Sequence, residues 1–300
     1  MSKINELVDR NMHEGMVIAR FGKYALIETE LGIHKRCAIR AHLKTIVVGD
    51  HILWQEVDKE QGVIVQCCAR NMLLMRYDDR GKQKPLAANL THLFVVVAKH
   101  PHINWLLLDS YLVAAEQLGL PTSIILNKMD LQPNELLHTL TTIYAPLGYA
   151  ILTLSQNNPD SQVIFANALQ DKVSVLVGQS GVGKSSILQQ FFPDEPIVTA
   201  ALSTSSALGA HTTSVSRLYR LASGGAIIDS PGIREFQLGA LSAQKILYGF
   251  REMHKFAAAC KYRNCSHSNT PGCELIKQVQ QGVVAQERYQ RMLSLLARSI

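Results

Sequence analysis

The chain has 300 residues, 47% of them hydrophobic, and a formal net charge of +6, which allows two or three domains with a sizeable core. Its apolar runs are only strand-length and its first residues, MSKINELVDRNMHEG, lack an apolar segment, so we expect neither a membrane span nor a signal peptide. Six cysteines are few for a secreted disulfide scaffold, which favours a reducing, cytoplasmic setting.

The charge is unevenly distributed along the chain. Residues 236–300 contain nine Lys and Arg against three Asp and Glu, whereas residues 86–235 contain seven against ten. A basic surface favours a polyanionic partner such as nucleic acid. We therefore expect the C-terminal segment to contact a polyanion, while the smaller excess in residues 1–85 is interpreted as ordinary surface charge.

Residues 1–76 contain five short strand patterns, GMVIAR, KYALIET, GIHKRCAI, DHILWQEV and GVIVQCC. Such a series predicts a small barrel, with an OB-like, RNA-binding fold favoured and an SH3-like barrel as the alternative. Cys37, Cys67 and Cys68 lie on these strands and are interpreted as barrel core. Residues 77–91 are polar, with Gly81 and Pro85, and are interpreted as a linker.

Residues 92–240 alternate between strand and helix patterns, which predicts an α/β domain with a mostly parallel sheet. Within it, GQSGVGKSS follows the strand KVSVLVG and precedes a helix, the context of a P-loop. Lys184 would pair with the β- and γ-phosphates, as a catalytic charge, and Ser185 would ligate Mg²⁺. The whole loop is a candidate nucleotide site: Gly178, Gln179, Ser180, Gly181, Val182, Gly183, Lys184, Ser185 and Ser186.

Two further segments predict contacts to Mg²⁺ and the γ-phosphate. In Asp229-Ser230-Pro231-Gly232, which ends the strand GAIID, Asp229 would hold Mg²⁺ and the Gly232 N–H would meet the γ-phosphate. In GAHTTS, an effector-loop threonine would close on Mg²⁺. Thr212 and Thr213 are both candidates, Thr213 is favoured on position, and the simpler alternative is that they only begin a strand.

The tetrapeptide Asn127-Lys128-Met129-Asp130 follows the strand TSIIL and matches the guanine-reading NKxD pattern. The Asp130 carboxylate accepts from N1–H and the 2-amino group of guanine, donors that adenine lacks, so ATP is disfavoured. Asn127 would brace the loop and the Lys128 stem would cover the base. Ser155, after the next strand, is the candidate for a companion base-contacting loop.

The base reader precedes the phosphate loop, the reverse of the usual order. Ligands of doubly wound sheets bind at the carboxyl ends of strands, so position in space matters and chain order does not. The segment is therefore predicted to be a circularly permuted GTPase domain. The chain leaves this domain just after DSPG, which tethers residues 241–300 directly to the segment that senses the γ-phosphate.

Residues 241–300 are helix-rich and contain Cys260, Cys265, His267 and Cys273 in a C-x4-C-x-H-x5-C pattern. Three thiolates and an imidazole suit one structural Zn²⁺. His254 is a reserve ligand. The alternative, ordinary core cysteines, fits poorly with the polar residues among them.

Catalysis poses a separate question, because Ile233 stands where many GTPases place a water-orienting glutamine after DxxG. His211, in the effector loop, is the candidate group, since a histidine can orient water or accept a proton near neutral pH. The alternative is a loop histidine without chemistry.

The strand-rich N-terminus, the order NKMD, GQSGVGKS and DSPG, and the Cys/His pattern together resemble the RsgA family of ribosome-assembly GTPases over nearly the whole chain. The resemblance implies a GTPase that binds GTP and GDP, associates with the small (30S) ribosomal subunit late in its maturation, contacts 16S rRNA and turns over faster on that subunit. We expect a monomer without membrane contact. The rival hypotheses are a large-subunit assembly GTPase, a GTP-controlled RNA-binding switch with negligible hydrolysis, and a P-loop kinase.

Overall fold

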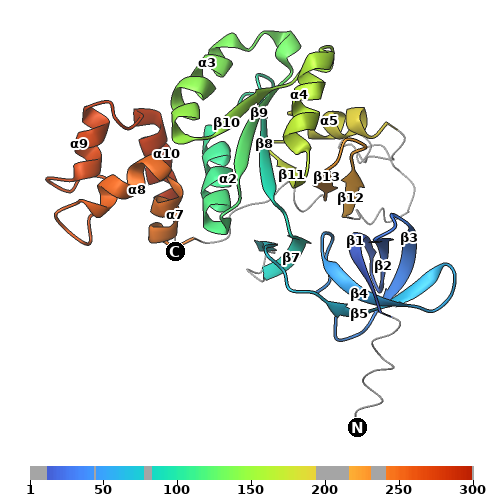
Figure 1. Cartoon of the computed structure of the whole chain (residues 1–300). Coiled ribbons are helices and arrows are strands. Elements are labelled where there is room, and N and C mark those ends of the chain that lie inside the picture. The colour runs from blue at the N-terminus through green and yellow to red at the C-terminus, as the bar shows by residue number, and fades with distance from the viewer. Residues whose placement is uncertain (1–11, 44, 78–82, 194–215, 231–240, 299–300) are drawn as a thin grey trace, which may run out of the picture. The chain divides into compact units, whose positions relative to one another are not determined.

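A computed structural model of the chain describes residues 12–43, 45–77, 83–193, 216–230 and 241–298 (Figure 1). It divides into two compact units. The first comprises Met1–Thr91, Leu169–Val175 and Phe191–Arg234, and the second comprises His92–Ala168, Leu176–Gln190 and Glu235–Ile300, so far as their residues are described.

The first unit begins with a closed five-stranded barrel, as predicted. Its strands are β1 (His13–Phe21), β2 (Tyr24–Thr29), β3 (His34–Ile39), β4 (His51–Glu56) and β5 (Gln61–Cys67). They are hydrogen-bonded in the order β1-β2-β3-β5-β4, and β4 pairs back with β1. The parallel β3–β5 pairing and this order are those of an OB-like barrel, so the SH3-like alternative is set aside.

The barrel core is built by alternate residues of these strands. Cys37 is fully buried in it beside Trp54 and Ile64, and burial raises the pKa of the Cys37 thiol to about 11. Cys67 packs against the cluster from its margin. The prediction for Cys68 was wrong, because this residue lies just past the end of β5 and is partly exposed.

Residues 77–91, which we interpreted as a linker, contain a strand in their described part. Strands β6 (Leu73–Tyr77) and β7 (Gln83–Ala88) form an antiparallel pair. Pro85 occupies a position next to a register shift in this two-stranded sheet, where its missing N–H is tolerated. The polar residues before β7 indicated a loop, so the strand was not predicted. Its last three residues, Leu86 to Ala88, are buried.

Two further strands of the first unit, β12 (Arg217–Arg220) and β13 (Ala226–Asp229), form an antiparallel pair. Strand β12 also pairs with barrel strand β1 through Ala19 and Arg217, and Arg220 forms an ion pair with Glu28 of β2. On its other side, β13 pairs in parallel with the first residues of β11 (Val173–Val177). Barrel and α/β strands are thus joined by main-chain hydrogen bonds.

The second unit contains three parallel strands, β8 (His92–Ala98), β9 (Thr122–Asn127) and β10 (Ala150–Thr153). Every residue of β8 and β9 is buried, which explains their unbroken apolar runs. The helices among them are α2 (Trp105–Leu118), α3 (Asn134–Ile143), α4 (Pro159–Leu169) and α5 (Lys184–Phe191), with short 3-10 turns η2 (Met129–Leu131) and η3 (Ala145–Leu147) (Figure 1). The predicted mostly parallel α/β fold is confirmed.

The C-terminal helices are α7 (Ala243–Gly249), α8 (Arg251–Ala258), α9 (Glu274–Gln280) and α10 (Gln286–Leu296). Their apolar core includes Val113 of α2 together with Ile246, Phe250 and Met292. The approach of α7 to α2 requires Gly249, because a Cβ there would lie 2.6 Å from a Val113 methyl carbon. Among the described helices, none has the length and apolarity that a bilayer span requires.

Candidate nucleotide site and metal centre

The P-loop connects β11 to α5, as the motif requires. Gly178, Gly181 and Gly183 have φ of 142°, 81° and 101°, a region that L side chains rarely adopt. A Cβ at Gly178 would lie 2.2 Å from the Val96 carbonyl oxygen, and one at Gly183 would lie 2.3 Å from Asn127 Nδ2. The glycines therefore let this loop pass against β8 and the NKMD segment.

Lys184 is nearly buried at the start of α5, with 8% of its surface exposed. Its Nζ donates to the carbonyl oxygens of Gly178 (2.5 Å) and Gln179 (2.8 Å). These hydrogen bonds hold the Lys184 ammonium group against main-chain carbonyls of the P-loop itself. A fixed point charge at this position is what a P-loop offers to β- and γ-phosphates.

The NKMD segment is hydrogen-bonded to the P-loop. The buried Asn127 side chain donates through Nδ2 to the Val182 carbonyl (2.9 Å). Lys128, itself in the left-handed region at φ 62°, donates to the carbonyls of Gly181 (2.8 Å) and His100 (2.9 Å). Two motifs that the sequence predicted to share one site thus lie side by side despite their reversed order.

Asp130 lies in η2 beside the loop that follows β10. Ser155 Oγ donates to Asp130 Oδ1 at 3.3 Å, and the Met129 N–H donates to the Leu154 carbonyl at 3.1 Å. Ser155 is buried and its own N–H donates to Ser161 Oγ. Ser155, the candidate for the companion loop, therefore contacts the carboxylate expected to read guanine.

The candidate Mg²⁺ residues are less completely described. Ser185 lies in the first turn of α5 in the second unit, whereas Asp229 ends β13 in the first unit. Next to Asp229, the buried Ser230 accepts a hydrogen bond from Ser216 Oγ at 2.8 Å. His211, Thr212, Thr213, Gly232 and Ile233 lie outside the described residues, so the Mg²⁺ and catalytic assignments stay predictions.

The four predicted metal ligands come together in one cluster. The ligand atoms of Cys260, Cys265, His267 and Cys273 all lie within 4.8 Å of one another. Cys260 Sγ is 3.7 Å from Cys273 Sγ, and each of these sulfurs is 3.6 Å from His267 Nδ1. A tetrahedral Zn²⁺ with Zn–S of about 2.3 Å and Zn–N of about 2.0 Å has edges of about 3.8 and 3.5 Å. The cluster could hold a zinc ion.

The surroundings of the cluster suit a metal-binding imidazole. Burial lowers the pKa of His267, which favours the neutral ligand form, and the Tyr289 hydroxyl donates to the His267 carbonyl at 2.6 Å. Burial and the neighbouring thiols raise the pKa of Cys273 to about 11, so this thiol stays protonated unless a bound cation stabilises its thiolate. His254, the reserve ligand, lies outside the cluster and contacts Tyr248.

Sequence reasoning missed the contacts that hold the P-loop from the side of α2. The Asn104 N–H donates to Gln179 Oε1 at 3.1 Å, and the Asn104 side chain caps α2 by accepting from the Leu107 N–H. The His100 carbonyl, which accepts from Lys128, was also missed. Main-chain groups carry no residue-type signal, so nothing in the sequence marked these two positions.

A P-loop hydrogen-bonded to an NKxD segment that precedes it in the chain defines a circularly permuted GTPase. Comparisons agree with this class. The family model of the RsgA GTPase matches residues 67–239. The chain therefore belongs to the RsgA GTPase family, whose members hydrolyse GTP.

Individual relatives and solved structures show the extent of the similarity. The chain is 39% identical over 287 residues to the small ribosomal subunit biogenesis GTPase RsgA of Yersinia enterocolitica, covering 92% of this chain and 82% of that protein. It resembles the crystal structure of YjeQ from Thermotoga maritima at 26% identity and a TM-score of 0.77, covering 95% and 98% of the two chains. YloQ, a circularly permuted GTPase, shares the fold at 24% identity and a TM-score of 0.74, covering 96% and 95%.

We expect Asp130→Asn to shift the nucleotide preference from guanine toward xanthine. The carboxylate has two acceptor oxygens for the N1–H and the 2-amino group of guanine, and the amide replaces one of them by a donor. Loss of charged hydrogen bonds worth about 1.5–3 kcal/mol each predicts GDP binding weaker by on the order of 10²-fold. Titration with fluorescent GDP and XDP measures the change. Glu135→Gln, in the adjacent helix, serves as control, and unchanged GDP affinity in Asp130→Asn would refute the base-reading assignment.

Proposed function

We propose that the chain binds the small ribosomal subunit late in its maturation, contacts 16S rRNA, and hydrolyses GTP in a cycle that this subunit stimulates. The observation that carries the proposal is the hydrogen-bonded P-loop and NKMD pair in a chain that also has an OB-like barrel and a Cys/His cluster. The names of its relatives support the small subunit as partner. This setting is cytoplasmic, and GTP, GDP and Mg²⁺ complete the cycle.

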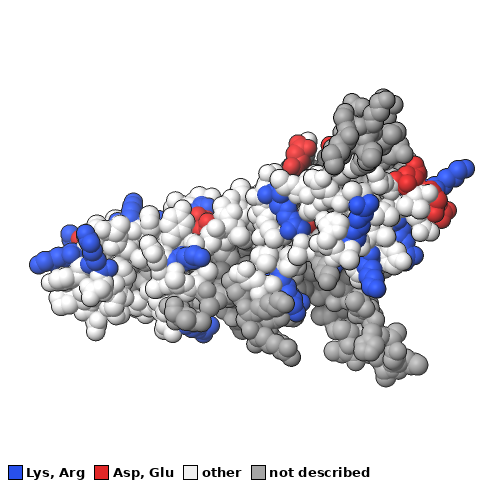
Figure 2. Space-filling view, turned by 90° about the horizontal axis from the view of Figure 1, so that it is seen from below, with Lys and Arg blue, Asp and Glu red and all other residues white. Residues whose placement is uncertain are grey.

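The C-terminal helices offer RNA a smaller basic surface than their composition suggests. Arg251, Arg288 and Arg291 form ion pairs with acidic side chains of the same unit. Three of the basic residues that remain, Lys255, Lys261 and Arg263, lie in the stretch between Glu252 and Glu274, which contains the Cys/His cluster and no Asp or Glu. On the face shown in Figure 2, Lys and Arg stand over the C-terminal helices with few acidic side chains among them.

The chemistry of this cluster-side surface suits single-stranded or looped RNA. Tyr262 is 47% exposed, the Lys261 Nζ lies 5.5 Å from its ring centre, and Lys255 and Arg263 are exposed nearby in the chain. Exposed rings stack on bases while Lys and Arg neutralise phosphates. The barrel has a comparable pair, Arg36 stacked 4.2 Å from the centre of the half-exposed Tyr24 ring.

Binding to the small subunit should tighten with a non-hydrolysable GTP analogue relative to GDP, because the γ-phosphate-sensing segment is tethered directly to the basic C-terminal helices. It should weaken steeply as salt rises, through counterion release from RNA phosphates. Co-sedimentation with purified small and large subunits measures both effects. Lys261→Ala with Arg263→Ala should reduce the salt dependence, while Lys59→Ala, on a barrel turn, is the control. Equal affinity in both nucleotide states would remove the switch from the proposal.

The Cys/His cluster is proposed to hold one structural Zn²⁺, since its spacing fits a tetrahedral ion and its donors are the soft ligands that zinc prefers. The ion would fix the loop between α8 and α9, and no residue of the P-loop belongs to it. Cys265→Ser should therefore lose the metal and the order of this loop while nucleotide binding is largely kept. Elemental analysis of gently purified protein provides the measurement, with Cys68→Ser as control. A wild-type protein without zinc would contradict the proposal.

His211 is proposed as the group that activates or orients the attacking water once the subunit orders the effector loop. Its support is the sequence alone: an apolar Ile233 at the usual glutamine position and a histidine beside Thr212 and Thr213. Positioned acid–base groups contribute about 10²–10⁴-fold. His211→Ala should thus lose most subunit-stimulated turnover in a multiple-turnover assay, with GTP affinity nearly unchanged. A fully stimulated variant would mean that the ribosome supplies the group.

A further inference from the structure

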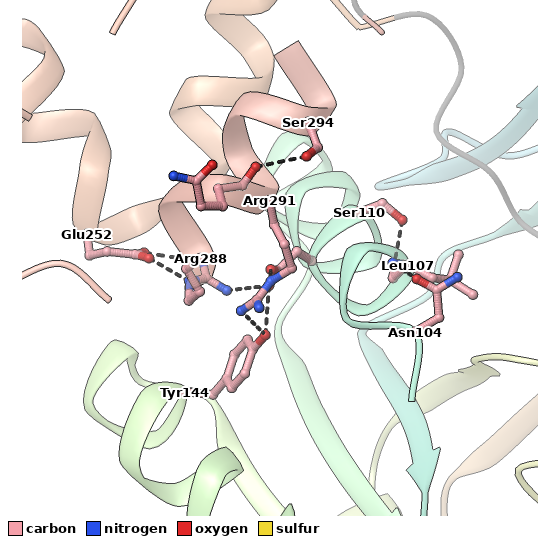
Figure 3. Close-up of polar contacts among 10 residues, drawn as sticks. Asn104, Leu107, Ser110, Tyr144, Glu252, Arg288, Arg291 and Ser294 are labelled. Carbon is pink, nitrogen blue, oxygen red and sulfur yellow. Dashed lines mark hydrogen bonds and ion pairs between the residues drawn. The ribbon is translucent and has the colours of Figure 1, made fainter. Parts of the chain in front are cut away.

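Asp109 of α2 is a fully buried carboxylate that belongs to neither the candidate nucleotide site nor the Cys/His cluster. It accepts hydrogen bonds from Arg288 and Arg291 of α10 and from the Tyr144 hydroxyl, which lies 3.0 Å away. Figure 3 shows these α10 side chains and Tyr144 converging beside α2. Removal of one partner of a buried ion pair leaves an uncompensated charge, so these contacts favour the docking of α10 on α2.

Arg288 also connects this cluster to the rest of the C-terminal helices. It is 1% exposed and bonds Glu252 of α8 on its other side (Figure 3). Arg291 lies over the Trp105 ring at 5.5 Å from its centre. Trp105 in turn stacks nearly parallel to Tyr144, at 5° and 6.2 Å between ring centres. Side chains of α10 and Tyr144 therefore contact the first two turns of α2 at Trp105 and Asp109.

The start of the same helix contacts the P-loop. Asn104 caps α2, and its N–H donates to the Gln179 side chain, so the position of Gln179 follows that of the helix start. A crevice lined by Leu107, Tyr111 and Val182 occupies the adjoining space shared by α2, β8 and the loop. The loop is therefore linked to the start of α2 by the hydrogen bond from the Asn104 N–H to the Gln179 side chain.

We propose that the first turns of α2 couple the nucleotide site to the docking of α10, with Asp109 as a positioning residue that contacts α10 and the Asn104–Gln179 hydrogen bond as the link to the P-loop. Nucleotide that orders the P-loop then stabilises α10 on α2. By linkage, the factor by which nucleotide strengthens the docking of α10 equals the factor by which docking strengthens nucleotide binding, so release of α10 lowers nucleotide affinity by that factor. The inference rests on nucleotide binding at the P-loop and adds a second connection besides the covalent tether after DSPG.

The test is the affinity of the full-length protein for fluorescent GDP. Asp109→Asn should weaken binding by about 5-fold or more, the lower range of measured couplings. Glu116→Gln is the matched control, because Glu116 lies near the other end of α2 and pairs with the partly exposed Arg251. It should bind within about 2-fold of wild type. If Asp109→Asn also binds within that range, the coupling is refuted.

Trp105 provides a direct signal of the coupling, because it is the first residue of α2 and its ring contacts Arg291. GDP should change the Trp105 emission of wild type and of Glu116→Gln, and the change should vanish in Asp109→Asn even at saturating GDP. Trp105→Phe identifies the signal against that of Trp54, which lies in the barrel. A change that survives in Asp109→Asn would overturn the proposal, because a merely structural role leaves it in place.

A second variant keeps the test decisive if Asp109→Asn does not fold. Arg291→Lys retains the charge at a side chain that is 15% exposed but loses the planar fork. It should bind GDP more weakly than Glu116→Gln does and show a smaller GDP-induced change in Trp105 emission. If both quantities equal those of Glu116→Gln, the coupling is refuted. Absence of GDP binding by wild type would refute nucleotide binding at the P-loop itself, a separate outcome.

Discussion

The hydrogen bonds from Asn127 and Lys128 to the P-loop are the contacts on which the nucleotide site depends. They join the NKMD segment after β9, the proposed base reader, to the P-loop some fifty residues later in the chain, at Val182 and Gly181. Gly183 makes the approach possible, because any side chain there would meet Asn127. The proposed guanine nucleotide site requires both motifs at a fixed separation, and these hydrogen bonds hold them together whatever the order of the segments along the chain.

The basic excess of the C-terminal segment overstates the positive charge that its surface offers to a partner. Arg251, Arg288 and Arg291 count toward its basic excess, yet all three pair with carboxylates of their own unit. They hold α8 and α10 against α2, and burial of Arg288 is possible only because Asp109 and Glu252 surround it. The proposed polyanion contact therefore falls to other exposed basic residues, among them Lys255, Lys261 and Arg263 near the Cys/His cluster in the chain.

Features set by local spacing could be predicted from the sequence, and features set by distant contacts could not. The P-loop, NKMD and the four candidate metal ligands are each contained in one short segment of the chain. Their chemistry can therefore be predicted from local spacing. Asp109 and Arg288 are 179 residues apart, and neither stands in a motif, so their pairing required the fold. Strand β7 was missed for a related reason: its pairing with β6 outweighs the polar, proline-containing sequence that indicated a linker.

We propose that GTP turnover by this protein depends on the small ribosomal subunit. Multiple-turnover hydrolysis measured with each purified subunit tests this proposal most directly. The account predicts slow hydrolysis by the free protein, a large stimulation by small subunits and none by large subunits, with ATP not hydrolysed. Equal stimulation by large subunits, or a rate unchanged by small subunits, would contradict it.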